Sequence, residues 1–217
     1  MKLINQAASE SNKLIFALTI SSNSHCPMKQ SRTRQKKKDV RHGVSANVNN
    51  VKRRKGAIPV RKLKLYLDTS TISHLFADDT PEKMEDTNRF WNDAVSGKFE
   101  IFISAVVTDE IENCTEPKRS QMFEKLQQIQ FQILSRTNEI SQLANEYVAG
   151  GVLSEKSFAD CLHIAFAVVY NCDIIISWNF KHLVNVKTIN KVKVVNAINN
   201  YREISIMPPT MLLEEVE

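Results

Sequence analysis

The sequence is poor in the residues that build several common kinds of functional site. Its four cysteines, Cys26, Cys114, Cys161 and Cys172, form no CxxC pair and have no histidine at metal-ligand spacing, which argues against a disulfide framework or a zinc site. It has only five glycines and no glycine-rich phosphate-binding loop. The apolar run at residues 14–20 is far too short to span a membrane, and the polar residues after it make a poor signal-peptide cleavage site. The sequence therefore predicts a cytoplasmic protein without a membrane segment.

Acidic residues are scarce in the first part of the chain. Residues 1–62 hold 15 of the 29 lysines and arginines but only Glu10 and Asp39, whereas the rest of the chain is net acidic. Residues 21–58 also have too few large apolar side chains to offset the entropy cost of ordering. We therefore expect residues 1–60 to be a mostly disordered basic extension, either a plain solvated segment or an arm attracted to nucleic acid phosphates. Residues 61–217 are expected to form the folded domain.

Short apolar runs alternate with helix-like segments after residue 60. The apolar runs predict strands at 63–68, 99–104, 173–177 and 192–195. Between them, 3.6-residue periodicity and start signals at Thr80-Pro81, Ser104 and Thr137 predict helices, including a nearly apolar helix over 158–169. Strands separated by helices indicate a parallel sheet. The predicted fold is a three-layer α/β/α sandwich with a central parallel sheet.

Three carboxylates stand where a predicted strand meets a helix start. Asp68 ends the first strand, Glu110 lies early in the helix after the second strand, and Asp160 lies in the first turn of the apolar helix. Each has a plain alternative, because Asp68 and Asp160 would suit helix capping and Glu110 a solvated helix face. A parallel sheet would nevertheless gather all three along one edge. Their mutual repulsion there would favour a bound divalent cation.

Several motifs together resemble those of the PIN-domain nucleases, and most closely the bacterial VapC-like toxins. They are the strand that ends in Asp68-Thr69-Ser70, the segment from Ser104 to Glu110, FADCLHIA at 158–165 and CDIIISWNF at 172–180. The resemblance extends over about residues 63–213. It implies a metal-dependent endoribonuclease in which Asp68, Glu110 and Asp160 are the catalytic acids and hold Mg²⁺ or Mn²⁺. It also implies, as candidate partners, an RNA substrate, a cognate antitoxin protein and a second copy of the chain in a homodimer.

One position departs from the pattern of the family. The family's fourth acidic position falls on Asn179, which offers hydrogen bonds but no charge. Ser177, at the end of the third predicted strand, is an auxiliary residue that could orient a ligand. The departure leaves open whether one or two ions are bound, with Asp109 and Asp173 as the nearest substitutes for the missing acid.

Two other functions are alternatives to a nuclease. A phosphatase of the haloacid dehalogenase type also begins with a strand that ends in Asp, but it needs a second Asp where this chain has Ser70. The stronger alternative is a PIN-like module that binds RNA or a protein without hydrolysis. Asn179 favours that alternative, whereas three retained acids oppose it, because unneutralised carboxylates would repel phosphates.

Overall fold

A five-stranded parallel sheet organises residues 61–213, the part of the chain that the computed structural model describes. The predictions made for residues 1–60 fall outside these described residues. The strands lie in the order β3-β2-β1-β4-β5, and each neighbouring pair is parallel. Their bounds are β1 (Lys64–Leu67), β2 (Glu100–Ser104), β3 (Phe131–Leu134), β4 (Ile174–Ile176) and β5 (Ser205–Met207).

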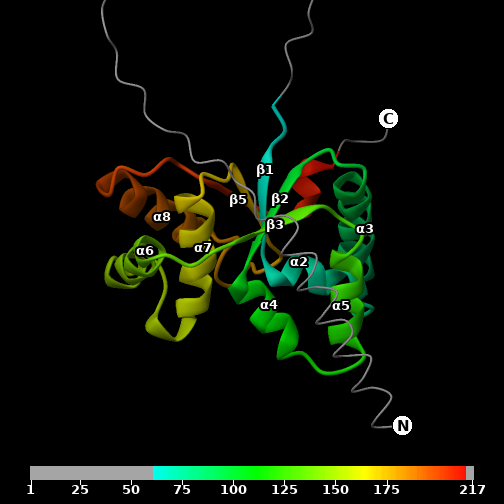
Figure 1. The fold of residues 1–217 in the computed structure, drawn as a ribbon. Coiled ribbons are helices and arrows are strands. Elements are labelled where there is room, and N and C mark those ends of the chain that lie inside the picture. The colour runs from blue at the N-terminus through cyan, green and yellow to red at the C-terminus, as the bar shows by residue number, and fades with distance from the viewer. Residues whose placement is uncertain (1–60, 214–217) are drawn as a thin grey trace, which may run out of the picture.

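Helices cover the sheet on both sides, which confirms the predicted three-layer α/β/α sandwich. In Figure 1, α6, α7 and α8 lie on one side of the strands and α3 and α5 on the other, while α2 and α4 lie at the end where β1 and β2 finish. Among residues 61–213, no helix combines the length and hydropathy needed to cross a membrane. The helix bounds are α2 (Thr69–Ser73), α3 (Pro81–Val95), α4 (Ala105–Glu112), α5 (Lys118–Leu126), α6 (Asn138–Ala149), α7 (Phe158–Val169) and α8 (Val186–Ile198), with 3-10 turns at η1 (His74–Phe76), η2 (Glu155–Ser157) and η3 (Pro209–Leu212).

The central strands form because their side chains are apolar on both faces. Leu65, Tyr66 and Leu67 of β1 are fully buried, and the three isoleucines of β4 pack beside them in register. Continuous apolar runs of this kind are typical of parallel strands covered by helices on both sides. The predicted bounds of the first three strands agree with β1, β2 and β4 to within one residue at each end. The apolar helix α7 is buried from Cys161 to Val168, as expected for a central helix.

The strand predicted at 192–195 is wrong, because these residues lie within α8. The valine-rich sequence favours a strand locally, but Val192 and Val195 are three residues apart and both face the core. Asn185 also caps the helix, since its side-chain oxygen accepts a hydrogen bond from the backbone N–H of Lys187. Burial of one helical face and a good cap therefore override the β propensity of valine.

The two edge strands, β3 and β5, were not predicted as strands. β3 and β5 are short, and their partly exposed residues lack the continuous apolar pattern of the central strands. Thr137 caps α6 as predicted, since its hydroxyl accepts from Ile140 N. Thr80 and Ser104 make no side-chain cap bond at the starts of α3 and α4. Ser104 instead bonds Tyr66, which matters for the site described next.

Candidate metal centre at the carboxyl edge of the sheet

Asp68 follows β1 directly and carries its carboxylate into the carboxyl edge of the sheet. Its backbone N–H donates to Ile176 O, so the sheet fixes its position. It precedes α2, yet its side chain makes no cap bond, so the capping interpretation is wrong for this residue. Its Oδ2 accepts hydrogen bonds from Ser177 Oγ at 2.7 Å and from Ser70 Oγ. The side chain is nearly buried, with the residue 4% exposed.

Glu110 reaches the same edge from α4. Its Oε2 accepts from Thr69 Oγ1, the residue after Asp68, and lies 3.3 Å from His163 Nε2. Burial alone would raise the pKa of Glu110. The hydrogen bond from His163, the charge of His163 and the hydrogen bond from Thr69 together lower this pKa below its usual value. Glu110 is therefore held as a carboxylate beside Asp68 and is not a freely solvated helix residue.

His163 is a member of the site to which the sequence analysis gave no role. It is 1% exposed, and its Nε2 lies 3.6 Å from Asp68 Oδ1 as well as 3.3 Å from Glu110 Oε2. One ligand atom from each of these three residues lies within 4.8 Å of the others. Burial would lower the pKa of His163, but the bond to Glu110 and the charge of Asp68 raise this pKa above its usual value.

A chain of hydrogen bonds orients the His163 ring from behind. Its Nδ1 lies 2.7 Å from Tyr66 OH, which lies 2.7 Å from Ser104 Oγ. All three side chains are buried, so the chain leaves Nε2 facing the carboxylates. The available sequence signal was spacing: His163 lies three residues after Asp160, on the same face of a helix that is otherwise apolar.

Asp160 lies in the first turn of α7 but outside the tight group of three. Its Oδ1 accepts a 2.8 Å hydrogen bond from Asn179 Nδ2. Its pKa is raised first by burial; the charges of His182 and His163 oppose this, and those of Asp68 and Glu110 add to it. The three predicted acids are therefore electrostatically coupled, although only Asp68 and Glu110 share ligand distance with His163.

The end of β4 connects these acids through Ser177 and Asn179. Ser177 Oγ donates to Asp68 and accepts from the Asn179 backbone N–H at 2.9 Å. Asn179 binds Asp160 through Nδ2, while its Oδ1 accepts from His182 N at 3.0 Å. Both predicted auxiliary residues thus contact a predicted acid. Asp173, considered as a substitute fourth acid, precedes β4 and so lies at the opposite end of the strands.

Cations from lysine or arginine do not neutralise this edge. Within residues 61–213, Asp68, Glu110 and Asp160 form no ion pair with a lysine or arginine, and the positive charges that act on them come from His163 and, for Asp160, also from His182. Carboxylate oxygens are the ligands preferred by Mg²⁺ and Mn²⁺, and an imidazole nitrogen adds a donor for transition metals. The donor set therefore fits one divalent cation between Asp68 and Glu110.

A family model matches the chain, and a solved structure is similar to it. The family model described as "PIN domain" matches residues 65–181, a range that contains Asp68, Glu110, Asp160, Ser177 and Asn179. Among solved structures, the crystal structure of VapBC2 from Rickettsia felis bound to a DNA fragment from their promoter is similar at 14% identity and a TM-score of 0.40. That similarity covers 66% of this chain and 97% of the other. No curated protein matches the sequence.

Proposed function

This chain belongs to the PIN domain family, and from that premise we propose that it is a metal-dependent endoribonuclease that hydrolyses RNA phosphodiester bonds. The acids that carry the activity are Asp68, Glu110 and Asp160. They hold Mg²⁺ or Mn²⁺, and Ser177 and Asn179 support them as auxiliary residues. The bound ion would supply Lewis acidity and activation of water at neutral pH.

The observation that carries this proposal is the excess of negative charge at a nearly buried carboxylate. Asp68 and Glu110 lie within ligand distance of each other and share one histidine, without a lysine or arginine partner among residues 61–213. Close carboxylates in a partly buried place repel each other and cost stability unless a cation binds between them. Even a protonated His163 would offset only one of the two negative charges.

The chain's own residues hold these acids in position. Hydroxyl groups of Ser70 and Ser177 orient the Asp68 carboxylate, and the Thr69 hydroxyl orients Glu110. Such partners of metal ligands commonly change metal affinity or activity about 10- to 100-fold when removed. The site is therefore preorganised on strand ends and helix starts, where its geometry is fixed by the sheet.

We further propose that the chain is the toxin of a toxin–antitoxin pair. This finer proposal rests on the resemblance of its motifs to the VapC-like group, and it predicts a cognate antitoxin protein that binds the chain. A homodimer and a cytoplasmic location follow from the same resemblance. Co-purification with the product of a neighbouring gene tests the antitoxin.

Cleavage of single-stranded RNA by the purified full chain tests the nuclease. We expect cleavage with Mn²⁺ that stops with EDTA and is absent from Asp68→Asn protein prepared in the same way. The Asp173→Asn variant is the matched control, because it makes the same substitution at the opposite end of the sheet. Cleavage that continues in EDTA, or in Asp68→Asn, would contradict the proposal.

One observation favours a second function, a PIN-like module that binds RNA or protein without hydrolysis. Asn179 supplies an amide where the family pattern has an acid, and its Nδ2 donates a hydrogen bond to Asp160 Oδ1. Because this hydrogen bond already stabilises the Asp160 carboxylate, Asp160 gains less from binding a cation. Calorimetry with Mn²⁺ separates the two functions, since a module that is only a binder has no need of a tight ion site.

A further inference from the structure

A group of aromatic and basic side chains borders the acids, and we call it the aromatic rim: His74, Lys83, Trp178 and Phe180. The ring of His74 stacks on Trp178 with centroids 5.6 Å apart, and Phe180 lies 6.0 Å from Trp178. Lys83 Nζ lies 5.5 Å from the centre of the Trp178 ring and 5.4 Å from that of Phe180. The rim therefore combines ring faces with a cation.

Hydrogen bonds attach the aromatic rim to the catalytic acids. Trp178 and Phe180 flank Asn179, whose side chain binds Asp160. On the other side, the Trp178 backbone N–H donates to Ser70 Oγ, the hydroxyl that donates to Asp68. His74 Nδ1 lies 2.7 Å from Ser70 O. The rim is thus one residue away from the acids on both sides.

The two aromatic residues Trp178 and Phe180 differ in how far they are buried. Trp178 is only 7% exposed, and its Nε1 donates to Thr87 Oγ1 at 2.8 Å, so it packs as part of the domain. Phe180 is 45% exposed beside a polar site. Single exposed apolar residues are common on protein surfaces, and Val194 of α8 is another here. Phe180 differs because a buried tryptophan supports it and an ammonium group lies over its ring.

Positive charges surround this position although the site itself is acidic. Burial lowers the pKa of His74, and the charges of Lys83 and Lys118 lower it further, against opposing effects of Ser70 O and Asp79. His182 acts on Asp160 from the residues that follow Phe180. Lys83 forms no ion pair within residues 61–213. Acids that suit a cation are therefore bordered by cations that suit phosphates.

We propose that Phe180 is a stacking surface for an unpaired base of single-stranded RNA next to the cleaved bond, with Lys83 binding a neighbouring phosphate. This inference rests on the proposed function and names the form of its substrate. A ring face beside a cation is the arrangement that binds single strands without sequence preference, because every base has a π face. Bases within a duplex are already stacked on each other and cannot use such a surface.

RNA binding by the full chain tests the inference independently of cleavage. Fluorescence anisotropy of a labelled short oligouridine is measured with Ca²⁺ in place of Mn²⁺, so that the acids are neutralised, with KCl raised stepwise. We expect Phe180→Ala to weaken binding on the order of tenfold, as for other base-stacking residues, and Phe180→Trp to restore it. Phe180→Leu, which keeps an apolar side chain but no ring, should behave like Phe180→Ala. Val194→Ala is the control for loss of an exposed apolar side chain.

Salt dependence separates the two contacts of the proposed surface. Lys83→Ala should reduce the slope of log affinity against log salt by about 0.7, the value for one phosphate contact on a single strand. Lys62→Ala is the control and should leave the slope unchanged, because Lys62 precedes β1 at the opposite end of the sheet. The Phe180→Ala loss should persist at high salt, because stacking is not screened. Thermal melting checks that each variant is folded.

The outcomes distinguish this inference from the proposed nuclease. Normal RNA affinity in folded Phe180→Ala would overturn the stacking surface. If Phe180→Ala loses affinity but the unmodified protein never cleaves RNA, the surface stands and the nuclease fails. Equal losses in Phe180→Ala and Phe180→Trp would also overturn the inference, because they would show that the ring itself is not used.

Discussion

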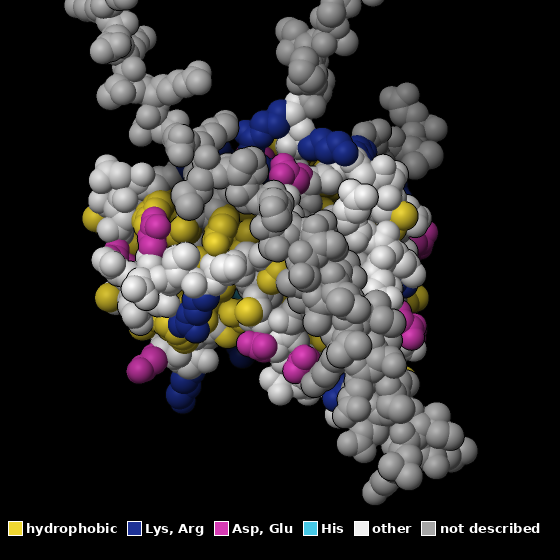
Figure 2. All heavy atoms as spheres, in the orientation of Figure 1, with side chains coloured by type: hydrophobic (Ala, Val, Ile, Leu, Met, Phe, Trp, Pro, Cys, Tyr) yellow, Lys and Arg dark blue, Asp and Glu magenta, His cyan; other side chains and the backbone are white. Residues whose placement is uncertain are grey.

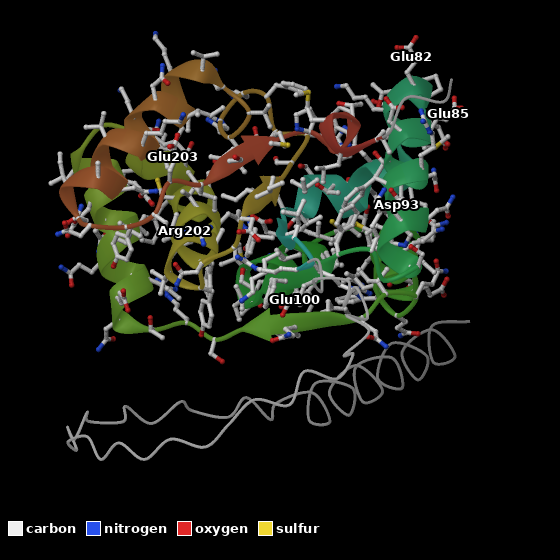
Figure 3. All side chains as sticks on the ribbon, turned by 90° about the horizontal axis from the view of Figure 1, so that it is seen from above. Glu82, Glu85, Asp93, Glu100, Arg202 and Glu203 are labelled. Carbon is white, nitrogen blue, oxygen red and sulfur yellow. The ribbon has the colours of Figure 1, made fainter. Side chains whose placement is uncertain are left out.

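Two aspartates beside the central strands sit at opposite ends of the sheet and have opposite surroundings. Asp173, just before β4, is bound by Arg61 Nη2 at 2.8 Å and Arg202 Nη2 at 3.0 Å. It also accepts a 2.9 Å bond from the Lys64 N–H at the start of β1. Burial would raise the pKa of Asp173, but the Lys64 N–H and the two arginines lower it below its usual value. Figure 3 looks down on this end of the sheet and labels Arg202 there.

Asp68, just after β1, has hydroxyl groups and a histidine in place of arginines. Hydroxyl donors orient a carboxylate but do not neutralise its charge. In Figure 2, basic side chains lie around the start of β1 with an acidic side chain between them, and acidic side chains lie over α4 at the other end. The same residue type is thus neutralised where it holds strands together and left without arginine or lysine where a cation can bind.

The largest effect that would sharpen this contrast is loss of activity from one aspartate alone. Asp68→Asn should reduce RNA cleavage by at least about 100-fold, since even partners of metal ligands are worth about 10- to 100-fold. Asp173→Asn should cleave normally. Initial rates with Mn²⁺ and circular dichroism of both variants measure the difference. Unfolding of Asp68→Asn would show instead that the two aspartates are both structural.

Adding charge at Asn179 should make the acidic end more dependent on metal. Asn179→Asp replaces the N–H donor to Asp160 with a second carboxylate, so the metal-free protein should melt at a lower temperature. Metal affinity should rise about tenfold, the scale of losing or gaining one partner at such sites. Calorimetry with Mn²⁺ resolves whether the gain falls on a second, weaker ion. Two equally tight sites in the unmodified protein would contradict this expectation.

Removing the charge of Asp173 should lower the stability of the protein but leave its activity unchanged. Asp173→Asn should lower the free energy of unfolding by about 1 kcal/mol at neutral pH, the upper end for ion pairs with exposed partners. Because folding lowers the pKa of Asp173, its stabilisation is present above the usual aspartate pKa and disappears as the pH falls through the folded value. Urea unfolding at neutral and acid pH should show the two proteins converging. A difference that grows in acid would contradict the pairing.

The smallest expected effect has the opposite sign. Folding raises the pKa of Asp160, so its ionised form costs stability at neutral pH, and this cost decreases as the pH falls from the raised value to the usual aspartate value. Asp160→Asn, which can still accept the bond from Asn179, should therefore stabilise metal-free protein by roughly 0.5 kcal/mol. With Mn²⁺ the order should reverse, because the unmodified protein gains more from binding the ion. Melting temperatures with EDTA and with Mn²⁺ test both halves.

The fold was predictable where burial alone decides the structure. The runs at 64–67 and 174–176 are apolar on both faces, so their strand character and parallel pairing follow from the sequence. The segment 192–195 has the same valine-rich composition, yet it is helical because the core covers only one of its faces. The edge strands β3 and β5 depend on pairing with a neighbour and on few apolar residues of their own. Pairing with a neighbouring strand cannot be predicted from the residues of the strand itself.

The site was predictable only in the part that follows from topology. Parallel strands bring their carboxyl ends together, which was enough to expect Asp68, Glu110 and Asp160 along one edge. The structure brings Asp68 and Glu110 within ligand distance, with Asp160 outside that group. His163 was missed, because a buried histidine in an apolar helix looks like a core residue. Its role depends on Tyr66 and Ser104, which come from two other strands. The aromatic rim was also missed, because its residues Lys83 and Phe180 are far apart in sequence and come together only in the fold.

The strand order itself has a consequence that does not depend on any single acid. From β1 the chain proceeds outward through β2 to β3, then returns across the sheet to place β4 on the other side of β1. The strands beside β1 are thus reached in opposite directions, and the bond between Asp68 and Ser177 spans this topological switch point. The chain leaves β1 toward α3 on one face of the sheet and leaves β4 toward α8 on the other (Figure 1), so the two connections diverge at this point. Variants that lack Asp68, Glu110 and Asp160 should therefore keep this divergence, because the chain path and not the carboxylates produces it.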